Sequence, residues 1–130
     1  MNKALKITMV LYAISGIVLG LAFIIIPRLL GSMLGYDSGP TFIAALTAML
    51  GASFISACIF LLIAARNPIK HILWVKYAIV FAILSLAAPL YSVILGHITL
   101  GQALPSIIIH AVFAAALLVF YPRSAARSEK

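Results

Sequence analysis

The stretch TFIAALTAMLGASFISACIFLLIAA, Thr41 to Ala65, contains no charged side chain and ends at Arg66-Asn67-Pro68. As an α-helix it extends about 37 Å, enough to cross a hydrocarbon core of about 30 Å with some tilt. Small side chains recur in it at every fourth position, at Ala44, Ala48, Ala52 and Ser56. Such a ridge lets the backbone of another helix approach closely. The stretch therefore predicts a membrane span with a small-residue packing face.

The composition of the whole chain agrees with a membrane protein. Of its 130 residues 65% are apolar and only 8% are charged, whereas soluble domains carry about 25% charged residues. A chain of this length holds one domain and leaves no room for a separate module outside the bilayer. The net charge of +7 comes from bases at segment ends that form no patch. The lipid bilayer is thus an expected partner, and nucleic acid is not.

The apolar pattern predicts an all-α polytopic membrane protein, a four-helix transmembrane bundle with short loops and spans at about residues 5–27, 41–65, 72–96 and 102–121. The first apolar run, Ile7 to Ile26, follows Lys3 and Lys6. It is too long for a cleaved signal peptide, whose apolar part has about 7 to 15 residues. Gly16 and Gly20 form a GxxxG pair in it, a close-packing face that we expect to be used within the chain.

A short amphipathic segment lies between the first two spans. Leu29, Leu30, Met33 and Leu34 recur at helical spacing before the Ser38-Gly39-Pro40 turn. This spacing predicts a small interfacial helix. Asp37 either pairs with Arg28 or is solvated, and both interpretations stay open.

The start of the fourth span has two competing signals. Thr99 and Gln102 have the spacing of a capping box, which would begin the helix at Leu100. Pro105 favours a start nearer to itself, because proline is well accommodated in a first helical turn. In the third span Pro89 frees the carbonyl of Ser85, so we expect a kink there.

Charge asymmetry predicts the orientation. Four spans place both termini on one side of the membrane. That side carries eight Lys and Arg residues, whereas the other side carries Arg28 alone. The eight are Lys3, Lys6, Arg66, Lys70, Lys76, Arg123, Arg127 and Lys130. The positive-inside rule then predicts a multi-pass protein of the cell inner (plasma) membrane with both termini in the cytoplasm.

The strongest polar pattern within the spans is Gln102, Ser106 and His110, at steps of four on one face of the fourth helix. Tyr91 and His97, at the end of the third helix and just beyond it, have comparable depth. Strongly polar groups inside a membrane normally face the bundle interior or a cavity. These five residues are therefore candidates for a small outward-facing pocket. The alternative is that Ser106 and His110 form hydrogen bonds that hold helices together.

A second polar stripe, Thr8, Tyr12 and Ser15, lies in the inner half of the first span, level with Lys76. If the two face each other, the Tyr12 hydroxyl can bind Lys76 and line an inner cavity. The alternative is that the hydroxyls bind carbonyls of their own helix.

No cofactor, metal or catalytic group is expected. A haem between His97 and His110 needs two imidazoles at similar depth, but His110 lies about 8 to 15 Å further into the membrane. The single cysteine, Cys58, forms no disulfide within the chain and no metal-binding motif. The sequence contains no nucleophile with a base, no carboxylate pair and no phosphate-binding loop, so we do not expect an enzyme.

The order of local motifs resembles a known family. Helix one ends in Ile26-Pro27-Arg28, the turn Leu30-Gly31-Ser32-Met33-Leu34-Gly35 follows, the second helix is rich in small residues, and the fourth closes with Tyr121-Pro122. This layout resembles the DoxX-like group of small four-span bacterial membrane proteins. The resemblance implies a role such as accessory subunit of a membrane oxidoreductase that deals with quinone. It transfers no site residue to this chain.

The sequence therefore favours a small integral membrane protein that acts through helix contacts, as an accessory subunit or a homo-oligomer, without catalysis of its own. Other membrane subunits or a second copy of the chain are the expected partners. One alternative is a membrane pocket for a lipophilic ligand such as a quinone. Another is a small oligomeric transporter or channel. The absence of Asp and Glu from all four spans argues against proton-coupled export.

Overall fold

The computed structural model describes residues 2–33 and 41–122, and within them it contains five helices and no strand. They are α1 (Asn2–Ile25), α2 (Pro27–Met33), α3 (Thr41–Arg66), α4 (Ile72–Ile94) and α5 (Leu100–Val119). All but α2 are long and apolar enough to cross a membrane. The chain is therefore a multi-pass helical membrane protein, and the predicted all-α, four-span fold with a short helix between the first two spans is confirmed. The predicted Ser38-Gly39-Pro40 turn lies outside the described residues.

Six of the eight predicted span boundaries shift by one to three residues, and local chemistry explains three of the shifts. α1 ends at Ile25, before the proline that begins α2 and cannot donate a backbone hydrogen bond. α4 ends at Ile94, shortly before Gly96, whose φ of 71° is a left-handed conformation that glycine adopts readily. α5 begins at Leu100 and not at the predicted 102, with Pro105 inside the helix.

The start of α5 is fixed by a complete capping box. The backbone N–H of Gln102 donates to the Thr99 hydroxyl oxygen at 3.3 Å. In return the backbone N–H of Thr99 donates to the Gln102 side-chain oxygen at 2.8 Å. Together these bonds satisfy two backbone donors that the first helical turn leaves free. The capping-box prediction is thus confirmed over the later start that Pro105 favoured.

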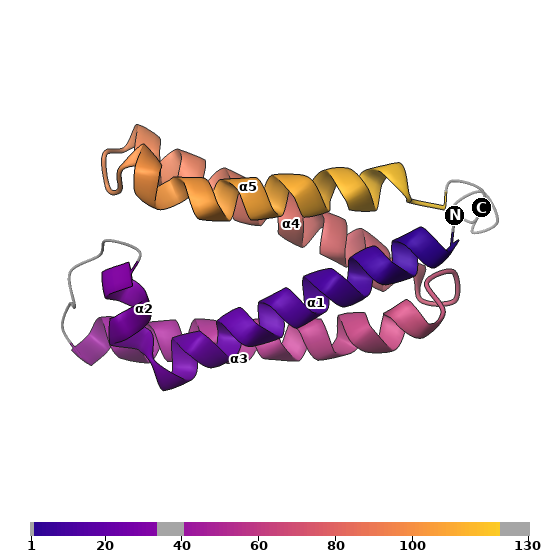
Figure 1. Cartoon of the computed structure of the whole chain (residues 1–130), viewed down its shortest axis with the longest axis horizontal. Helices are drawn as coiled ribbons and strands as arrows, with labels where there is room; N and C mark the ends of the chain where they lie inside the picture. Colours follow the sequence, from indigo (N-terminus) through magenta and orange to yellow (C-terminus); the bar gives the residue numbers. More distant parts are fainter. Residues whose placement is uncertain (1, 34–40, 123–130) are drawn as a thin grey trace.

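The four long helices form two pairs, α1 with α3 and α4 with α5 (Figure 1). The pairs meet at the end of the molecule that holds the start of α1 and the end of α5, which we call the closed end. They diverge toward the end that holds α2 and the connection between α4 and α5, which we call the open end. The molecule therefore has the outline of a V whose arms are helix pairs.

The core of the molecule lies in the half next to the closed end. Its buried side chains come from all four long helices, and Leu5, Met9, Val75 and Leu117 are among those that are fully enclosed. The complete cluster is Leu5, Met9, Tyr12, Ala13, Cys58, Leu61, Ala64, Ala65, Ile72, Val75, Ala78, Ala82, Ala114 and Leu117. On each helix these residues occupy the half nearest the closed end. Packing of this core is what joins the two pairs.

Within the first pair, α1 and α3 approach closely because both carry glycine at the contact. A Cβ atom on Gly20 would lie 2.7 Å from the backbone oxygen of Gly51 and 2.8 Å from a side-chain carbon of Ile55. A Cβ atom on Gly16 would meet the sulfur of Cys58. Small residues are the usual means by which membrane helices bring their backbones together.

Candidate ligand cleft between the helix pairs

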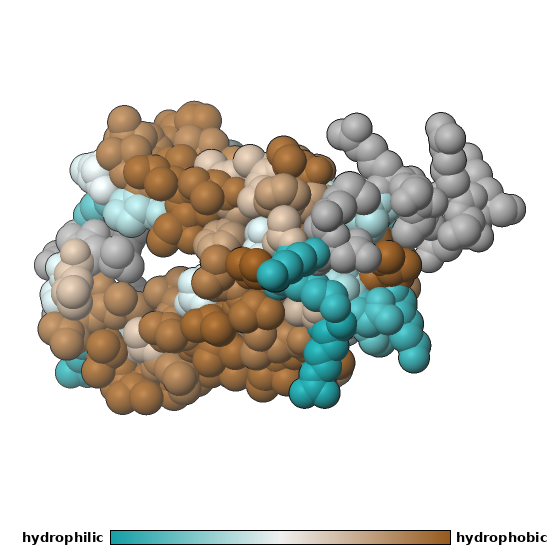
Figure 2. Space-filling view, turned by 45° about the vertical axis from the view of Figure 1, so that its right-hand side comes forward, coloured by the Kyte–Doolittle hydropathy of each residue, from teal (hydrophilic) through white to brown (hydrophobic). Residues whose placement is uncertain are grey.

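A cleft of about 1190 Å³ lies between the two helix pairs. All four long helices and α2 contribute side chains to its walls. The space-filling view shows an opening between the two halves of the molecule, bordered by apolar residues (Figure 2). The cleft is therefore the space that the diverging arms of the V leave between them.

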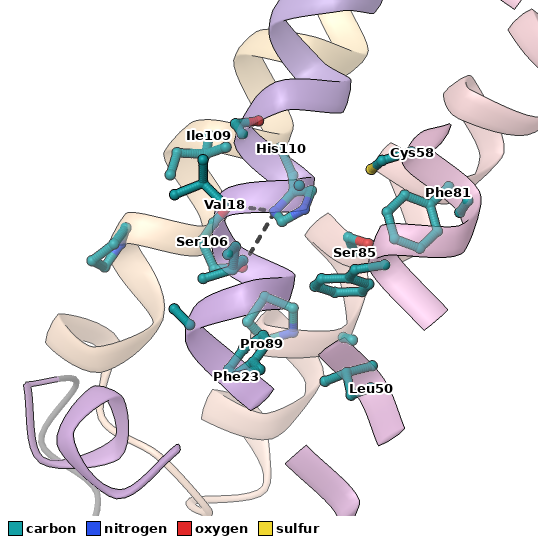
Figure 3. Close-up of a pocket in the computed structure, with 18 of the residues that line it drawn as sticks. Val18, Phe23, Leu50, Cys58, Phe81, Ser85, Pro89, Ser106, Ile109 and His110 are labelled. Atoms are coloured by element: carbon teal, nitrogen blue, oxygen red, sulfur yellow. Dashed lines mark hydrogen bonds between the residues drawn. The ribbon is translucent and has the colours of Figure 1, made fainter. Parts of the chain in front are cut away.

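The walls of the cleft are mostly apolar and aromatic. Phe23 of α1, Phe54 of α3 and Phe81 of α4 line it. Their rings form a chain, with centroids 6.0 Å apart between Phe23 and Phe54 and 5.5 Å apart between Phe54 and Phe81. Leu50 and Ile109 extend the apolar lining (Figure 3). Such walls suit a hydrocarbon occupant.

Tyr12 forms part of the floor, where the cleft meets the closed-end core. Its ring stacks on Phe113 of α5 at 4.5 Å and meets His110 edge-on at 6.2 Å. Only 5% of the residue is exposed, and its hydroxyl has no hydrogen-bond partner. The suggested bond between Tyr12 and Lys76 is therefore wrong. The ring holds α1 against α5. Burial of the hydroxyl without a hydrogen bond, however, lowers the free energy of unfolding.

Thr8 and Ser15 are the other two members of this polar stripe. For them the alternative, hydrogen bonds to carbonyls of their own helix, is confirmed. The Thr8 hydroxyl donates to the Ala4 carbonyl at 3.0 Å, and the Ser15 hydroxyl donates to the Tyr12 carbonyl at 2.8 Å. Neither side chain needs a partner on another helix.

Near the floor of the cleft, beside Tyr12, His110 bonds to Ser106 one turn earlier on the same helix. Its Nδ1 lies 2.8 Å from the backbone oxygen of Ser106 and 3.3 Å from the Ser106 hydroxyl oxygen. Because a carbonyl oxygen only accepts, the short contact assigns the hydrogen to Nδ1 and leaves Nε2 as an acceptor. These bonds stay within α5 and do not connect it to another helix. The hypothesis that this pair holds helices together is therefore not supported by the bonds it makes.

On the opposite wall, Pro89 and Ser85 lie one turn apart within α4. Proline has no N–H, so the Ser85 carbonyl lacks the bond that a regular helix would give it. Both residues line the cleft. Figure 3 shows Ser85, Phe81 and His110 around the same space. The polar groups of the cleft thus lie both toward its mouth, at Arg28 and Gln102, and deeper, at Ser85, Ser106 and His110.

The structure divides the five predicted pocket residues into two groups. His110, Ser106 and Gln102 line the cleft, as their spacing on one helical face predicted. Tyr91 and His97 do not line it: Tyr91 is 63% exposed on α4, and His97 is exposed in the connection after α4. Their inclusion is corrected, because depth along a helix does not determine the direction in which a side chain points. With His97 outside the cleft, the two histidines do not face a common haem site.

The predicted packing residues also separate. Gly16 and Gly20 lie at the contact with α3. Ala52 and Ser56 are exposed and Ala48 is half-buried, while the side chain of Ala44 lies outside the described part. The face of α3 that meets α1 instead carries Gly51, Ile55 and Cys58. Within this chain the four-residue ridge is therefore not the surface on which α1 packs.

Arg28 was not predicted as part of the site. It lies on α2 at the open end, is exposed, and contributes to the cleft lining. In the sequence Arg28 is separated from all the other bases. The charge asymmetry used this separation only to predict the orientation in the membrane. The suggested pairing with Asp37 lies outside the described residues.

No metal centre is formed by the part of the chain that the structure describes, since no three His, Cys, Asp or Glu side chains gather in residues 2–33 and 41–122. Comparison with known protein families, with curated proteins and with solved structures finds no match for this chain. Fold and site therefore define it as a small four-span helical membrane protein with an apolar cleft.

Proposed function

We propose that this chain is a non-catalytic membrane protein whose cleft binds a lipophilic ligand. The observation that carries the proposal is the cleft of about 1190 Å³ with walls from every long helix. Pockets for drug-sized molecules measure about 300 to 1,000 Å³, so this cleft accommodates a ligand with a long apolar part. Hydrocarbon in the cleft would also restore the dispersion contacts that its walls lack when it is empty.

The proposed location is the cell inner membrane, with the closed end at the cytoplasm. Lys3, Lys6, Arg66 and Lys70 belong to the closed end, and Arg28 belongs to the open end. The hydrophilic residues in Figure 2 also gather mainly toward the closed end. The positive-inside rule places the more basic end in the cytoplasm. The cleft then opens toward the outer leaflet.

The polar groups deep in the cleft limit which lipophilic ligand fits. His110 uses its Nδ1 hydrogen on Ser106, so Nε2 of the neutral imidazole accepts a hydrogen bond and does not donate one. A hydroxyl on a ligand can donate to it, whereas a quinone carbonyl cannot. The quinone that the sequence interpretation named therefore gains no donor from His110, although a quinol would meet an acceptor.

A matched pair of adjacent residues on α4 tests the proposal. Both are exposed, but Ala88 lines the cleft and Ala87 does not. We expect Ala88→Trp to fill the cleft and to remove lipid that co-purifies with the chain in mild detergent, measured by native mass spectrometry. Ala87→Trp adds the same bulk on the lipid-facing side and should leave the bound lipid unchanged. Equal retention of lipid by both variants would contradict a ligand in the cleft.

A second candidate function is supported by a different surface. Ala52 and Ser56 present small side chains on the exposed face of α3, where a helix from outside the chain can approach closely. This face supports a role as homo-oligomer or as accessory subunit, including the oxidoreductase subunit that the DoxX-like resemblance implies. Ser56→Leu should reduce cross-linking to a second copy or a partner in native membranes, while Ile59→Leu, on an already bulky exposed position, should not. Absence of any cross-linked species for the unaltered chain would remove this candidate.

A further inference from the structure

We infer that the ligand of the cleft is an amphiphile with an anionic headgroup, phosphate or carboxylate, held at Arg28, and a hydrocarbon chain that extends down the cleft. This inference rests on the proposed function, because it names the chemical class that the cleft binds. It goes beyond that function by assigning a headgroup position and a direction of insertion.

The first step is the distribution of charge along the cleft. Among the described residues that line it, Arg28 is the one Lys, Arg, Asp or Glu. It lies on α2, at the open end of the V (Figure 1). The charge is therefore at the mouth of the cleft, and the deeper lining carries no formal charge.

The second step is the chemistry that a guanidinium selects. Arginine offers a planar group of N–H donors that matches the oxygens of a phosphate or carboxylate and can bind two of them at once. A hydroxyl or ketone headgroup gains much less from this group. An anionic headgroup is therefore the class that benefits most from Arg28.

The third step is the depth of the apolar part. Tyr77 and Pro89 both line the cleft, and the helical rise between them on α4 is about 18 Å. Half of a hydrocarbon core of about 30 Å is about 15 Å. A hydrocarbon chain with its headgroup at the mouth can thus extend past Phe23, Phe54 and Phe81 to the floor of the cleft.

The fourth step concerns the polar groups that a hydrocarbon chain would pass. The polar hydrogen of His110 is already bonded to Ser106, and the Tyr12 hydroxyl oxygen is buried and so out of reach of a ligand in the cleft. Below the mouth the described lining still offers polar groups such as Nε2 of His110, the Ser85 carbonyl and the hydroxyls of Ser85 and Ser106, but no Lys or Arg. A chain can pass them at a modest cost, whereas an anionic group placed there would meet no cation.

The experiment measures equilibrium binding of two probes with the same chain, hexadecanoate and hexadecanol, to the full chain purified in mild detergent. We expect Arg28→Gln to weaken hexadecanoate binding about tenfold and to leave hexadecanol binding unchanged. Arg28→Lys keeps the charge and should retain most of the preference for hexadecanoate. Competition by phosphatidylglycerol would assign a lipid phosphate as the natural source of the anion, and failure of that competition would assign a free fatty acid.

Two outcomes would overturn the inference. One is equal binding of hexadecanoate and hexadecanol to the unaltered chain, and the other is an Arg28→Gln variant that binds both as tightly as before. Ala88→Trp distinguishes this failure from failure of the proposed function. If Ala88→Trp still weakens both probes, the cleft binds a ligand but Arg28 does not select it. If Ala88→Trp changes neither, the ligand cleft itself is refuted.

Discussion

The closed half and the open half of this molecule are built from the same four helices, yet they are stabilised differently. At the closed end, side chains such as Leu117, Val75 and Leu5 are fully buried between the pairs. Where the pairs diverge, cleft residues such as Ile109 remain 48% exposed. If lipid fills the cleft, its apolar walls can stay apart at little cost, because lipid tails are as apolar as the side chains they contact. Side-chain packing between the two helix pairs is thus concentrated in the half where the V closes.

The largest expected effect comes from truncating a buried leucine at the closed end. Leu117→Ala should lower the free energy of unfolding by about 2 to 5 kcal/mol, because the cavity it leaves is enclosed by protein. Ile109→Ala, on the same helix but at the cleft, should cost only about 0.5 kcal/mol, since lipid can replace the lost contacts. Unfolding in SDS mixed micelles, followed by circular dichroism, measures both. Equal losses would show that the two halves are packed alike.

A smaller effect is expected where α1 meets α3. Gly20→Ala places a Cβ atom against the Gly51 backbone and Ile55, so we expect a loss of about 1 to 3 kcal/mol. Gly31 serves as the control, because a Cβ atom added there has no atom within 4 Å. Gly31→Ala should be neutral or stabilising by up to about 1 kcal/mol, through helix propensity. The same unfolding assay compares them, and a harmless Gly20→Ala would contradict the close approach of the two helices.

The smallest expected effect has the opposite sign. Tyr12→Phe removes a buried hydroxyl that has no partner and keeps the ring that stacks on Phe113. We expect the free energy of unfolding to stay the same or to rise by about 1 kcal/mol. Tyr12→Ala, which also removes the ring between α1 and α5, should instead be strongly destabilising. A loss of stability in Tyr12→Phe as large as that of Tyr12→Ala would show that the hydroxyl is bonded.

The elements of the fold were predictable because their signals are local. Long uncharged runs define the spans, Pro27 separates α1 from α2, and Thr99 with Gln102 defines the start of α5. Each of these features depends on residues within a few positions of one another. The arrangement of the helices was less accessible, because helices that face lipid are apolar on every side and so do not show which face is packed.

The candidate site was likewise predictable within one helix but not between helices. The repeat of Gln102, Ser106 and His110 correctly placed three residues on one face of a helix, and all three line the cleft. Tyr91 was included by depth alone, and its side chain points elsewhere. Spacing in one helix reports a shared face, but the facing residues of another helix depend on rotation about its axis. The ridge on α3 was misread for the same reason, since Gly51 is the residue that meets α1.

The V shape itself is the central claim, and distances between α1 and α5 in a lipid bilayer test it most directly. Spin labels at Ile7 and Leu118 report the closed end, and labels at Ile24 and Leu104 report the open end; all four positions are exposed. With Cys58 replaced by alanine, double electron–electron resonance should give a shorter distance for the closed-end pair than for the open-end pair. Equal distances at the two ends would mean parallel helices and would contradict the cleft on which the proposed function depends.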